Sequence, residues 1–96
     1  MTPSRPGAQR RVKIVNQAGL HARSAAGLAR IASGARGAIW LARESLRADA
    51  TDIMDMLALA CGPGTEITLE AEDAADAVVL EQMAALIENG FGETGK

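Results

Sequence analysis

The chain has 96 residues and a formal net charge of −2 at pH 7, and 48% of its residues are hydrophobic but only 2% are aromatic. This length predicts one small domain with a modest core, and the scarcity of aromatic residues disfavours a base-stacking platform for nucleic acids. No stretch approaches the roughly 20 consecutive apolar residues of a membrane span, so we expect no membrane association. Cys61 is the sole cysteine and has no partner for an internal disulfide, which favours a reducing, cytoplasmic location.

The charged residues are distributed unevenly along the chain. Nine of the ten basic residues precede residue 48, and eleven of the twelve acidic residues follow it. The basic residues are scattered singly and form no nucleic-acid-binding motif, so we expect no nucleic-acid partner. A positive surface that suits an acidic protein partner is the favoured interpretation. A small nucleic-acid-binding domain is the most distant alternative, which steep salt dependence of DNA or RNA binding would support.

Hydrophobic periodicity predicts a β-α-β-β-α-β-α order of elements. Apolar residues at every second position indicate strands, and apolar residues three or four positions apart indicate helices. The expected segments are a flexible lead over 1–9, a strand over 11–15, a turn over 16–19, a helix over 22–32, a strand over 38–42, an edge strand over 45–48, a helix over 52–60, a strand over 65–72, a helix over 74–88 and a tail over 94–96.

The single apolar face of each strand predicts how these elements pack. Helices must cover that face, so we predict one α+β domain over 10–93. It is a two-layer open-faced sandwich, in which three helices cover one face of a four-stranded antiparallel sheet. The spacing of the strands along the sequence does not fix their order in the sheet.

Several residues predict how the helices begin, end and pack. Asp52 is expected to cap the second helix, with Asp55 completing a capping box. Gly34 is expected to end the first helix in a left-handed conformation, and Gly27 within that helix allows a neighbour to approach closely. Cys61, directly after the second helix, is interpreted as a small buried hydrophobe.

His21 is the single histidine and lies between a glycine turn and an alanine-rich helix. Gly19 lets the chain bend, and Leu20 is expected to anchor the turn in the core. Unpaired N–H groups and the helix dipole favour an anion at such a helix N-terminus, such as a phosphoryl group on the imidazole. Arg23 is close enough to bind that phosphate in a bidentate manner. A simple polar helix cap is the alternative interpretation of His21. One histidine and one cysteine also predict no metal site.

A second cluster of apolar residues lies on the predicted short helix. Core packing is the simpler interpretation, and we adopt it for Met56 and Leu59. A short helix cannot bury every face, so Ile53, Met54 and Leu57 are expected to form an exposed apolar patch for partner docking. The flexible methionine side chain suits partners of different shapes. The acidic face of the strand over 65–72 is interpreted as solvated exterior.

Four segments of the chain together resemble HPr, the histidine-containing phosphocarrier of the bacterial phosphoenolpyruvate-dependent phosphotransferase system. The similarity covers roughly residues 10–93, and the family fold has the same β-α-β-β-α-β-α order. The first of the four segments is the most specific. In chain order the segments are Gly19-Leu20-His21-Ala22-Arg23, Ile53-Met54, Gly64-Thr65-Glu66-Ile67 and Glu88-Asn89-Gly90-Phe91-Gly92-Glu93.

The resemblance implies that the chain is a phosphoryl carrier rather than an enzyme that turns over a small molecule. His21 would accept a phosphoryl group on Nδ1 from phosphorylated enzyme I and pass it to a IIA-type protein or domain, while Arg23 steadies the phosphate. The family's hydrophobic docking positions match Ala26, Ile53, Met54 and Leu57. No metal or organic cofactor is implied, and transient docking by a small domain suggests a monomer. The alternative is an HPr-like regulatory adaptor that binds a partner without efficient phosphoryl transfer.

Two positions depart from the pattern of many family members. Ser24 replaces a proline after the arginine, from which we expect a modest effect on the helix start. Asp52 replaces a serine that is the target of a regulatory kinase. Its simpler role is a helix cap, and the second hypothesis is that its charge partly mimics the phosphorylated serine and weakens docking on enzyme I. The small residues after Arg23 are closer to the nitrogen-related branch, and the sequence leaves open whether the acceptor serves sugar uptake or nitrogen regulation.

Overall fold

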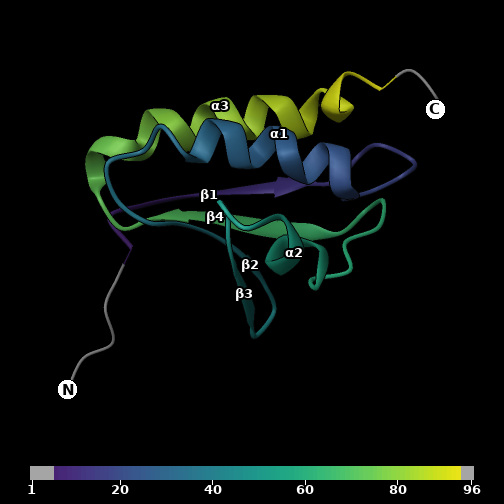
Figure 1. Cartoon of the computed structure of the whole chain (residues 1–96), viewed down its shortest axis with the longest axis horizontal. Coiled ribbons are helices and arrows are strands. Elements are labelled where there is room, and N and C mark those ends of the chain that lie inside the picture. The colour runs from purple at the N-terminus through teal and green to yellow at the C-terminus, as the bar shows by residue number, and fades with distance from the viewer. Residues whose placement is uncertain (1–5, 94–96) are drawn as a thin grey trace.

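The computed structural model describes residues 6–93, which fold into two layers with helices above a sheet (Figure 1). The sheet is antiparallel throughout, and its strand order is β1-β4-β2-β3. The strands are β1 (Ala8–Lys13), β2 (Ile39–Arg43), β3 (Leu46–Asp49) and β4 (Glu66–Ala71). The helices are α1 (Ala22–Ala32), α2 (Ile53–Leu57) and α3 (Ala77–Glu88), with the 3-10 turns η1 (Ala74–Asp76) and η2 (Gly90–Gly92) beside α3. The predicted open-faced sandwich and its element order are confirmed.

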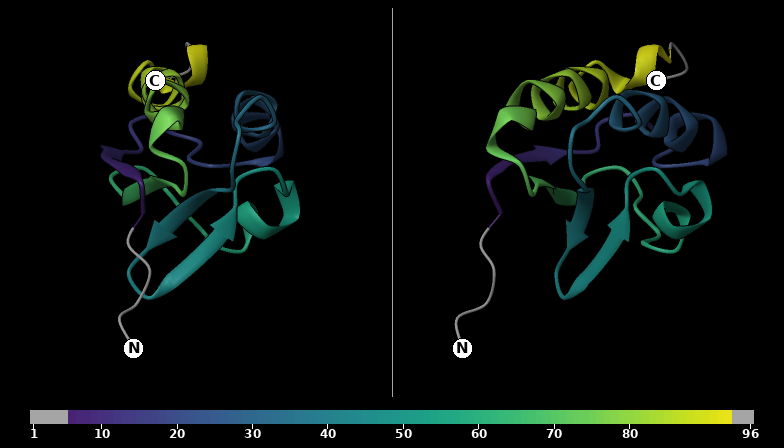
Figure 2. Two further views of the ribbon diagram at one scale, coloured as in Figure 1. Left: turned by 90° about the vertical axis from the view of Figure 1, so that its left-hand side faces the viewer. Right: turned by 60° about the vertical axis from the view of Figure 1, so that its left-hand side comes forward.

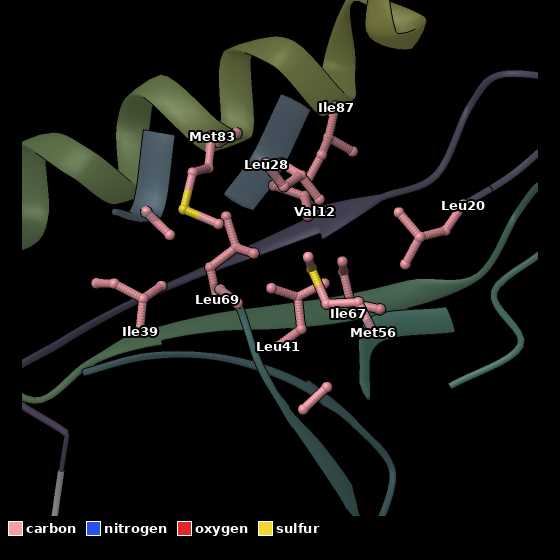
Figure 3. Packing of buried hydrophobic residues seen from close by; sticks show 14 of the residues in the cluster. Val12, Leu20, Leu28, Ile39, Leu41, Met56, Ile67, Leu69, Met83 and Ile87 are labelled. Atoms are coloured by element: carbon pink, nitrogen blue, oxygen red, sulfur yellow. The ribbon is translucent and has the colours of Figure 1, made fainter. Parts of the chain in front are cut away.

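The core lies between the sheet and the two longer helices. Figure 2 shows α1 and α3 side by side above the sheet, with α2 near the β3 edge. Alternate residues of the strands point up into this layer, as the two-residue period predicts. They meet apolar side chains of α1 and α3 that recur every three or four residues (Figure 3). The largest fully buried side chains are Ile14, Leu28, Ile39, Leu41, Met56, Ile67, Leu69, Leu80, Met83 and Ile87.

The first strand begins earlier than its sequence predicts. Ala8 and Gln9, which we expected in the flexible lead, pair with Ala71 and Glu70 of β4 and belong to β1. The strand ends at Lys13 rather than Val15, whose side chain is 54% exposed. The alternation of apolar residues at the start of the chain was too short to place either end. Residues 1–5 of the expected lead and the tail over 94–96 lie outside the described residues.

The short helix α2 is the element that differs most from its predicted span of 52–60. Asp52 caps it as expected, with its carboxylate accepting from the Asp55 N–H at 3.1 Å. The reciprocal half of a capping box is absent, because the Asp55 carboxylate accepts instead from the Asp49 N–H of β3 at 2.8 Å. The helix ends at Leu57, and Ala60 adopts φ +56°, a conformation that no α-helix continues.

Both longer helices are close to prediction, with two differences. The segment expected as one helix over 74–88 begins with the 3-10 turn η1, and α3 proper begins at Ala77. Gly34 is not left-handed, because the last turn of the first helix tightens instead. The N–H groups of Gly34 and Ala35 donate to the carbonyls three residues earlier, at 3.1 and 3.0 Å. Gly27 does permit close packing of α1 on α3, since a Cβ there would lie 3.2 Å from the Leu86 side chain. Among residues 6–93, no helix has the length and apolar character needed to cross a membrane.

Candidate functional site

The loop before α1 is fixed by a close backbone approach. Gly19 has φ +68°, and a Cβ at this position would lie 2.5 Å from the Cys61 carbonyl oxygen. The next residue, Leu20, is buried and donates its N–H to that same carbonyl at 2.8 Å. Leu20 therefore anchors the turn in the core, as expected, and the chain delivers His21 to the start of α1 with its side chain 29% exposed.

His21 is the N-cap residue of α1. Its Nδ1 accepts from the backbone N–H groups of Arg23 at 3.2 Å and Ser24 at 3.4 Å. In return, the Ser24 hydroxyl oxygen accepts from the His21 N–H at 2.8 Å. A nitrogen that accepts hydrogen bonds carries no proton in the neutral ring, so the ring proton belongs on Nε2. The capping interpretation of His21 is confirmed, and the capping atom is Nδ1.

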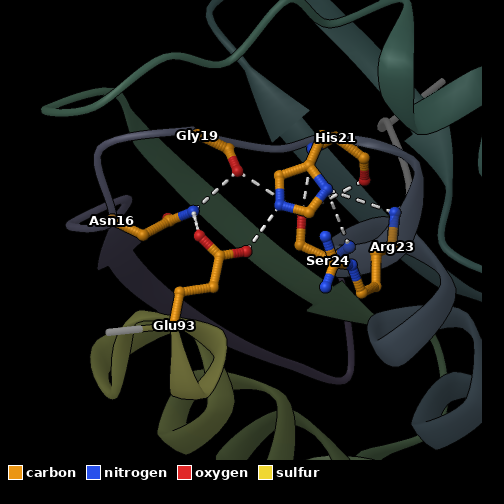
Figure 4. A network of polar contacts seen from close by, with 6 residues as sticks. All are labelled: Asn16, Gly19, His21, Arg23, Ser24 and Glu93. Atoms are coloured by element: carbon orange, nitrogen blue, oxygen red, sulfur yellow. Dashed lines mark hydrogen bonds and ion pairs between the residues drawn. The ribbon is translucent and has the colours of Figure 1, made fainter. Parts of the chain in front are cut away.

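The opposite ring nitrogen faces a carboxylate from the far end of the chain. Nε2 of His21 lies 2.5 Å from Oε2 of Glu93, 72 residues later in the sequence. The other carboxylate oxygen of Glu93 accepts from Nδ2 of Asn16 at 2.9 Å (Figure 4). These bonds, first that from Asn16 and then that from His21, hold the pKa of Glu93 below its ordinary value. The hydrogen bonds from Asn16 and His21 therefore favour the ionised form of Glu93 beside the ring.

Glu93 and Asn16 were not predicted as site residues. Glu93 entered only as the end of the fourth segment of the family resemblance, and Asn16 only as the start of a turn. The turn η2 that precedes Glu93 is unusual, since Gly90, Phe91 and Gly92 all adopt positive φ, at 65°, 58° and 72°. A non-glycine residue in this region is uncommon. The signal that could have indicated Glu93 is therefore the two glycines flanking Phe91.

Arg23 lies beside the ring without a fixed partner. Its side chain is exposed, and its guanidinium makes no hydrogen bond or ion pair with another residue between 6 and 93. It borders a groove of about 660 Å³ between α1 and the end of α3, together with Arg30 and the apolar side chains of Ile31, Leu86 and Phe91. The predicted role of Arg23 in binding a phosphate therefore stays a prediction, and its guanidinium forms no contact among residues 6–93 that would have to break first.

The expected docking residues lie on α1 and on α2, which pack against each other. Met54 is 75% exposed, whereas Ile53 and Leu57 are only partly exposed because they also pack against the core. Ala26 on α1 is likewise partly exposed. The exposed apolar surface is therefore centred on Met54. Met56 and Leu59 are buried, as expected.

Comparison with known proteins identifies the family. A family model described as the PTS HPr component phosphorylation site matches residues 8–89. This chain belongs to the HPr family. It is 36% identical over 85 residues to the phosphocarrier protein HPr of Cupriavidus necator, covering 88% of this chain and 96% of that protein. The HPr of Treponema pallidum is 37% identical over 82 residues, with 85% of this chain and 93% of that protein covered.

The fold comparison agrees with the family assignment. A crystal structure of HPr from Thermoanaerobacter tengcongensis superposes with a TM-score of 0.83 and 31% identity, over 90% of this chain and 97% of that one. The resemblance proposed from the four sequence segments is thus confirmed at the level of family and fold. Membership of the HPr family implies a role in phosphotransfer and partners from the phosphotransferase system in general.

Proposed function

We propose that this chain is a cytoplasmic phosphocarrier that accepts a phosphoryl group on Nδ1 of His21 from phosphorylated enzyme I and passes it to a IIA-type protein or domain. The observation that carries this proposal is the asymmetry of the His21 ring, in which Nε2 faces a carboxylate and Nδ1 faces backbone N–H groups. A ring protonated on Nε2 presents its lone pair, and hence its nucleophilic nitrogen, at Nδ1.

The surroundings of Nδ1 suit a phosphoryl group once it is attached. The N–H groups of Arg23 and Ser24, which contact Nδ1 in the unmodified chain, lie at the N-terminus of α1 and are suited to bond phosphoryl oxygens. The guanidinium of Arg23, which has no partner among residues 6–93, adds a charge-assisted, bidentate contact. Phosphoryl transfer requires mainly positioning and charge stabilisation, and this site can supply both.

Exposed apolar residues on α1 and α2 support docking of a protein partner. Met54 provides an exposed apolar side chain on α2, and Ala26, Ile53 and Leu57 extend the same region at lower exposure. Arg23 and Arg30 of α1 contribute positive charge to the groove between α1 and the end of α3. An acidic partner surface with an apolar centre fits this combination, and the exposed methionine suits both a donor and an acceptor of different shape.

The test is incubation with enzyme I, Mg²⁺ and phosphoenolpyruvate, followed by intact-mass measurement and phosphorus NMR. We expect an acid-labile phosphoryl adduct on the parent chain and none on His21→Ala. Addition of IIA proteins from sugar-uptake and nitrogen-related systems should then discharge the adduct and identify the acceptor branch. Absence of an adduct with an active enzyme I would overturn the proposal and support the regulatory-adaptor alternative.

A further inference from the structure

We infer that Glu93 and Asn16 are positioning residues that direct phosphoryl transfer to Nδ1 of His21 by holding its Nε2–H. This inference rests on the proposed function, because it assigns the residues that select the reacting nitrogen. Glu93 contacts the ring directly, whereas Asn16 acts through Glu93. Neither residue contacts Nδ1, where the phosphoryl group would be attached.

The two ring nitrogens are held with very different strength. The Nε2 contact to Glu93 is short and charge-assisted, at 2.5 Å. The Nδ1 contacts to the Arg23 and Ser24 N–H groups are long, at 3.2 and 3.4 Å. The Nδ1 contacts therefore cost less free energy to break than the Nε2 contact. An incoming phosphorus atom can reach Nδ1 by displacing these weak contacts, whereas Glu93 blocks Nε2.

Asn16 is a buried polar residue whose side-chain amide links the loop before α1 to Glu93. Its side-chain Nδ2 donates both to the Gly19 carbonyl at 2.8 Å and to Glu93 at 2.9 Å. The reverse amide orientation would point Oδ1 at two acceptors, so the geometry assigns the orientation. Oδ1 has no hydrogen-bond partner among residues 6–93, although the residue is only 7% exposed. A buried oxygen without a hydrogen-bond partner destabilises the fold. Asn16 is nevertheless present here, where its amide N–H groups connect the loop before His21 to Glu93.

The backbone conformation before Glu93 also supports a positioning role for this residue. Phe91 adopts φ +58° between two left-handed glycines, and the Glu93 N–H then donates to the Gly90 carbonyl at 3.0 Å. Left-handed backbone at a residue other than glycine costs free energy and is concentrated at functional sites. This turn, together with the contacts to Asn16 and His21, places the Glu93 carboxylate against the ring (Figure 4).

The transfer step follows from this arrangement. The Nδ1 lone pair forms the N–P bond while the bond between phosphorus and the donor atom breaks, and its electron pair leaves with the donor. The imidazole takes up positive charge and keeps its proton on Nε2, where the Glu93 carboxylate stabilises that charge. Return of the phosphoryl group to an acceptor reverses the same steps, and the proton again stays on Nε2.

Phosphoramidate is a suitable donor for the test, because it phosphorylates imidazole with release of ammonia and needs no docking protein. The variants are Glu93→Ala, Glu93→Gln and Asn16→Ala, with Glu66→Ala and Gln82→Ala as matched controls on exposed residues. Phosphorus and ¹⁵N NMR identify which ring nitrogen is phosphorylated, and ¹⁵N shifts of the unmodified ring report the fraction that is protonated on Nε2. In a folded variant, neither readout changes unless the contact at Nε2 changes.

In the parent chain and both controls we expect the Nε2–H form and an Nδ1 adduct. Glu93→Ala should produce a mixture of both adducts and slow Nδ1 phosphorylation roughly 10- to 100-fold. Glu93→Gln keeps an acceptor for Nε2–H without the charge, so it should keep the Nδ1 adduct but slow its formation. Asn16→Ala should resemble Glu93→Ala to a smaller degree.

An unchanged tautomer and adduct ratio in Glu93→Ala would overturn the inference. Because Glu93 lies at the end of the described chain and is partly exposed, that variant remains informative even if the buried Asn16→Ala variant fails to fold. Phosphorylation of the parent by phosphoramidate but not by enzyme I would overturn the proposed function, while the adduct ratios would still support the positioning roles.

Discussion

His21 and Ser24 cap each other across the first turn of α1. The Ser24 N–H faces Nδ1 of His21 at 3.4 Å, and the Ser24 hydroxyl oxygen accepts from the His21 N–H at 2.8 Å. Many HPr proteins resemble this chain but carry proline at the Ser24 position, and proline has neither an N–H nor a hydroxyl group. The serine therefore contributes hydrogen bonds to this helix start that proline cannot make, and one of them goes to the nitrogen that we propose as the phosphoryl acceptor.

Ser24→Ala should weaken the helix start without abolishing transfer. Loss of the hydroxyl removes one half of the reciprocal cap, so the free energy of unfolding should fall by about 1 kcal/mol, measured by urea denaturation. Phosphorylation by enzyme I should persist, because the Ser24 N–H remains. Ser33→Ala, on an exposed serine at the other end of α1, is the control for hydroxyl removal. Complete loss of phosphorylation in folded Ser24→Ala would contradict the modest role assigned to this position.

Neutralising Asp52 should accelerate phosphorylation by enzyme I. Its exposed carboxylate caps α2 beside Ile53 and Met54, so the charge lies next to the expected docking residues. Asn and Ser both retain a capping oxygen, and Asp52→Asn and Asp52→Ser should each raise the association rate roughly two- to tenfold at low salt. Asp52→Glu keeps the charge and serves as the comparison. Rates equal to the parent in both neutral variants would leave Asp52 as a helix cap and nothing more.

Substitutions of the two methionines of α2 should have different effects, one on partner docking and the other on the stability of the fold. Met54 is 75% exposed, so Met54→Ala should leave the melting temperature nearly unchanged and raise the KM for phosphorylated enzyme I several-fold. Met56 is fully buried, so Met56→Ala should lower the free energy of unfolding by about 2–5 kcal/mol through the cavity it leaves. Calorimetry and transfer kinetics on both variants check the pair. A KM for Met54→Ala that equals the parent value would argue against Met54 as the docking centre.

Asp76 should make the fold sensitive to acid. This buried carboxylate accepts from the N–H groups of Arg36 at 2.9 and 3.0 Å and of Gly37 at 2.9 Å, and these bonds lower the pKa of Asp76. The folded pKa thus lies below the unfolded value of about 3.9. The resulting stability is fully present above the unfolded pKa and is lost as pH falls through the folded pKa.

Asp76→Asn removes the titrating group but keeps one acceptor oxygen. The variant should melt at a lower temperature than the parent at pH 7, and the difference should shrink as the pH falls below about 4. Melting curves by circular dichroism from pH 7 to pH 2.5 measure both effects. Asp73→Asn, on the neighbouring carboxylate that caps η1, controls for the loss of an acidic residue in this segment. A melting difference that is constant with pH would show that ionisation of Asp76 does not stabilise the fold.

Local sequence patterns determined much of this molecule. The helix over 22–32 was predicted with both of its ends, because an apolar stripe and a capping residue are properties of consecutive residues. The alternation in β4 and the Asp52 cap were predicted for the same reason. His21 and Arg23 could be selected from the sequence because a histidine at a helix start, with an arginine two residues later, is a pattern within a single turn.

Only the tertiary structure decided the strand order and the partners of His21. Placing β4 between β1 and β2 depends on strand pairings between distant segments, which the two-residue period does not encode. The end of α2 and the start of β1 were also set by neighbours, since Asp55 bonds to β3 and Ala8 pairs with β4. Glu93 reaches the ring across 72 residues of chain because α3 packs against α1 and η2 turns the backbone back. The sequence was enough to select His21 as the proposed phosphoryl acceptor, whereas long-range packing decided that Nε2 of its ring faces Glu93 and that Nδ1 faces the start of α1.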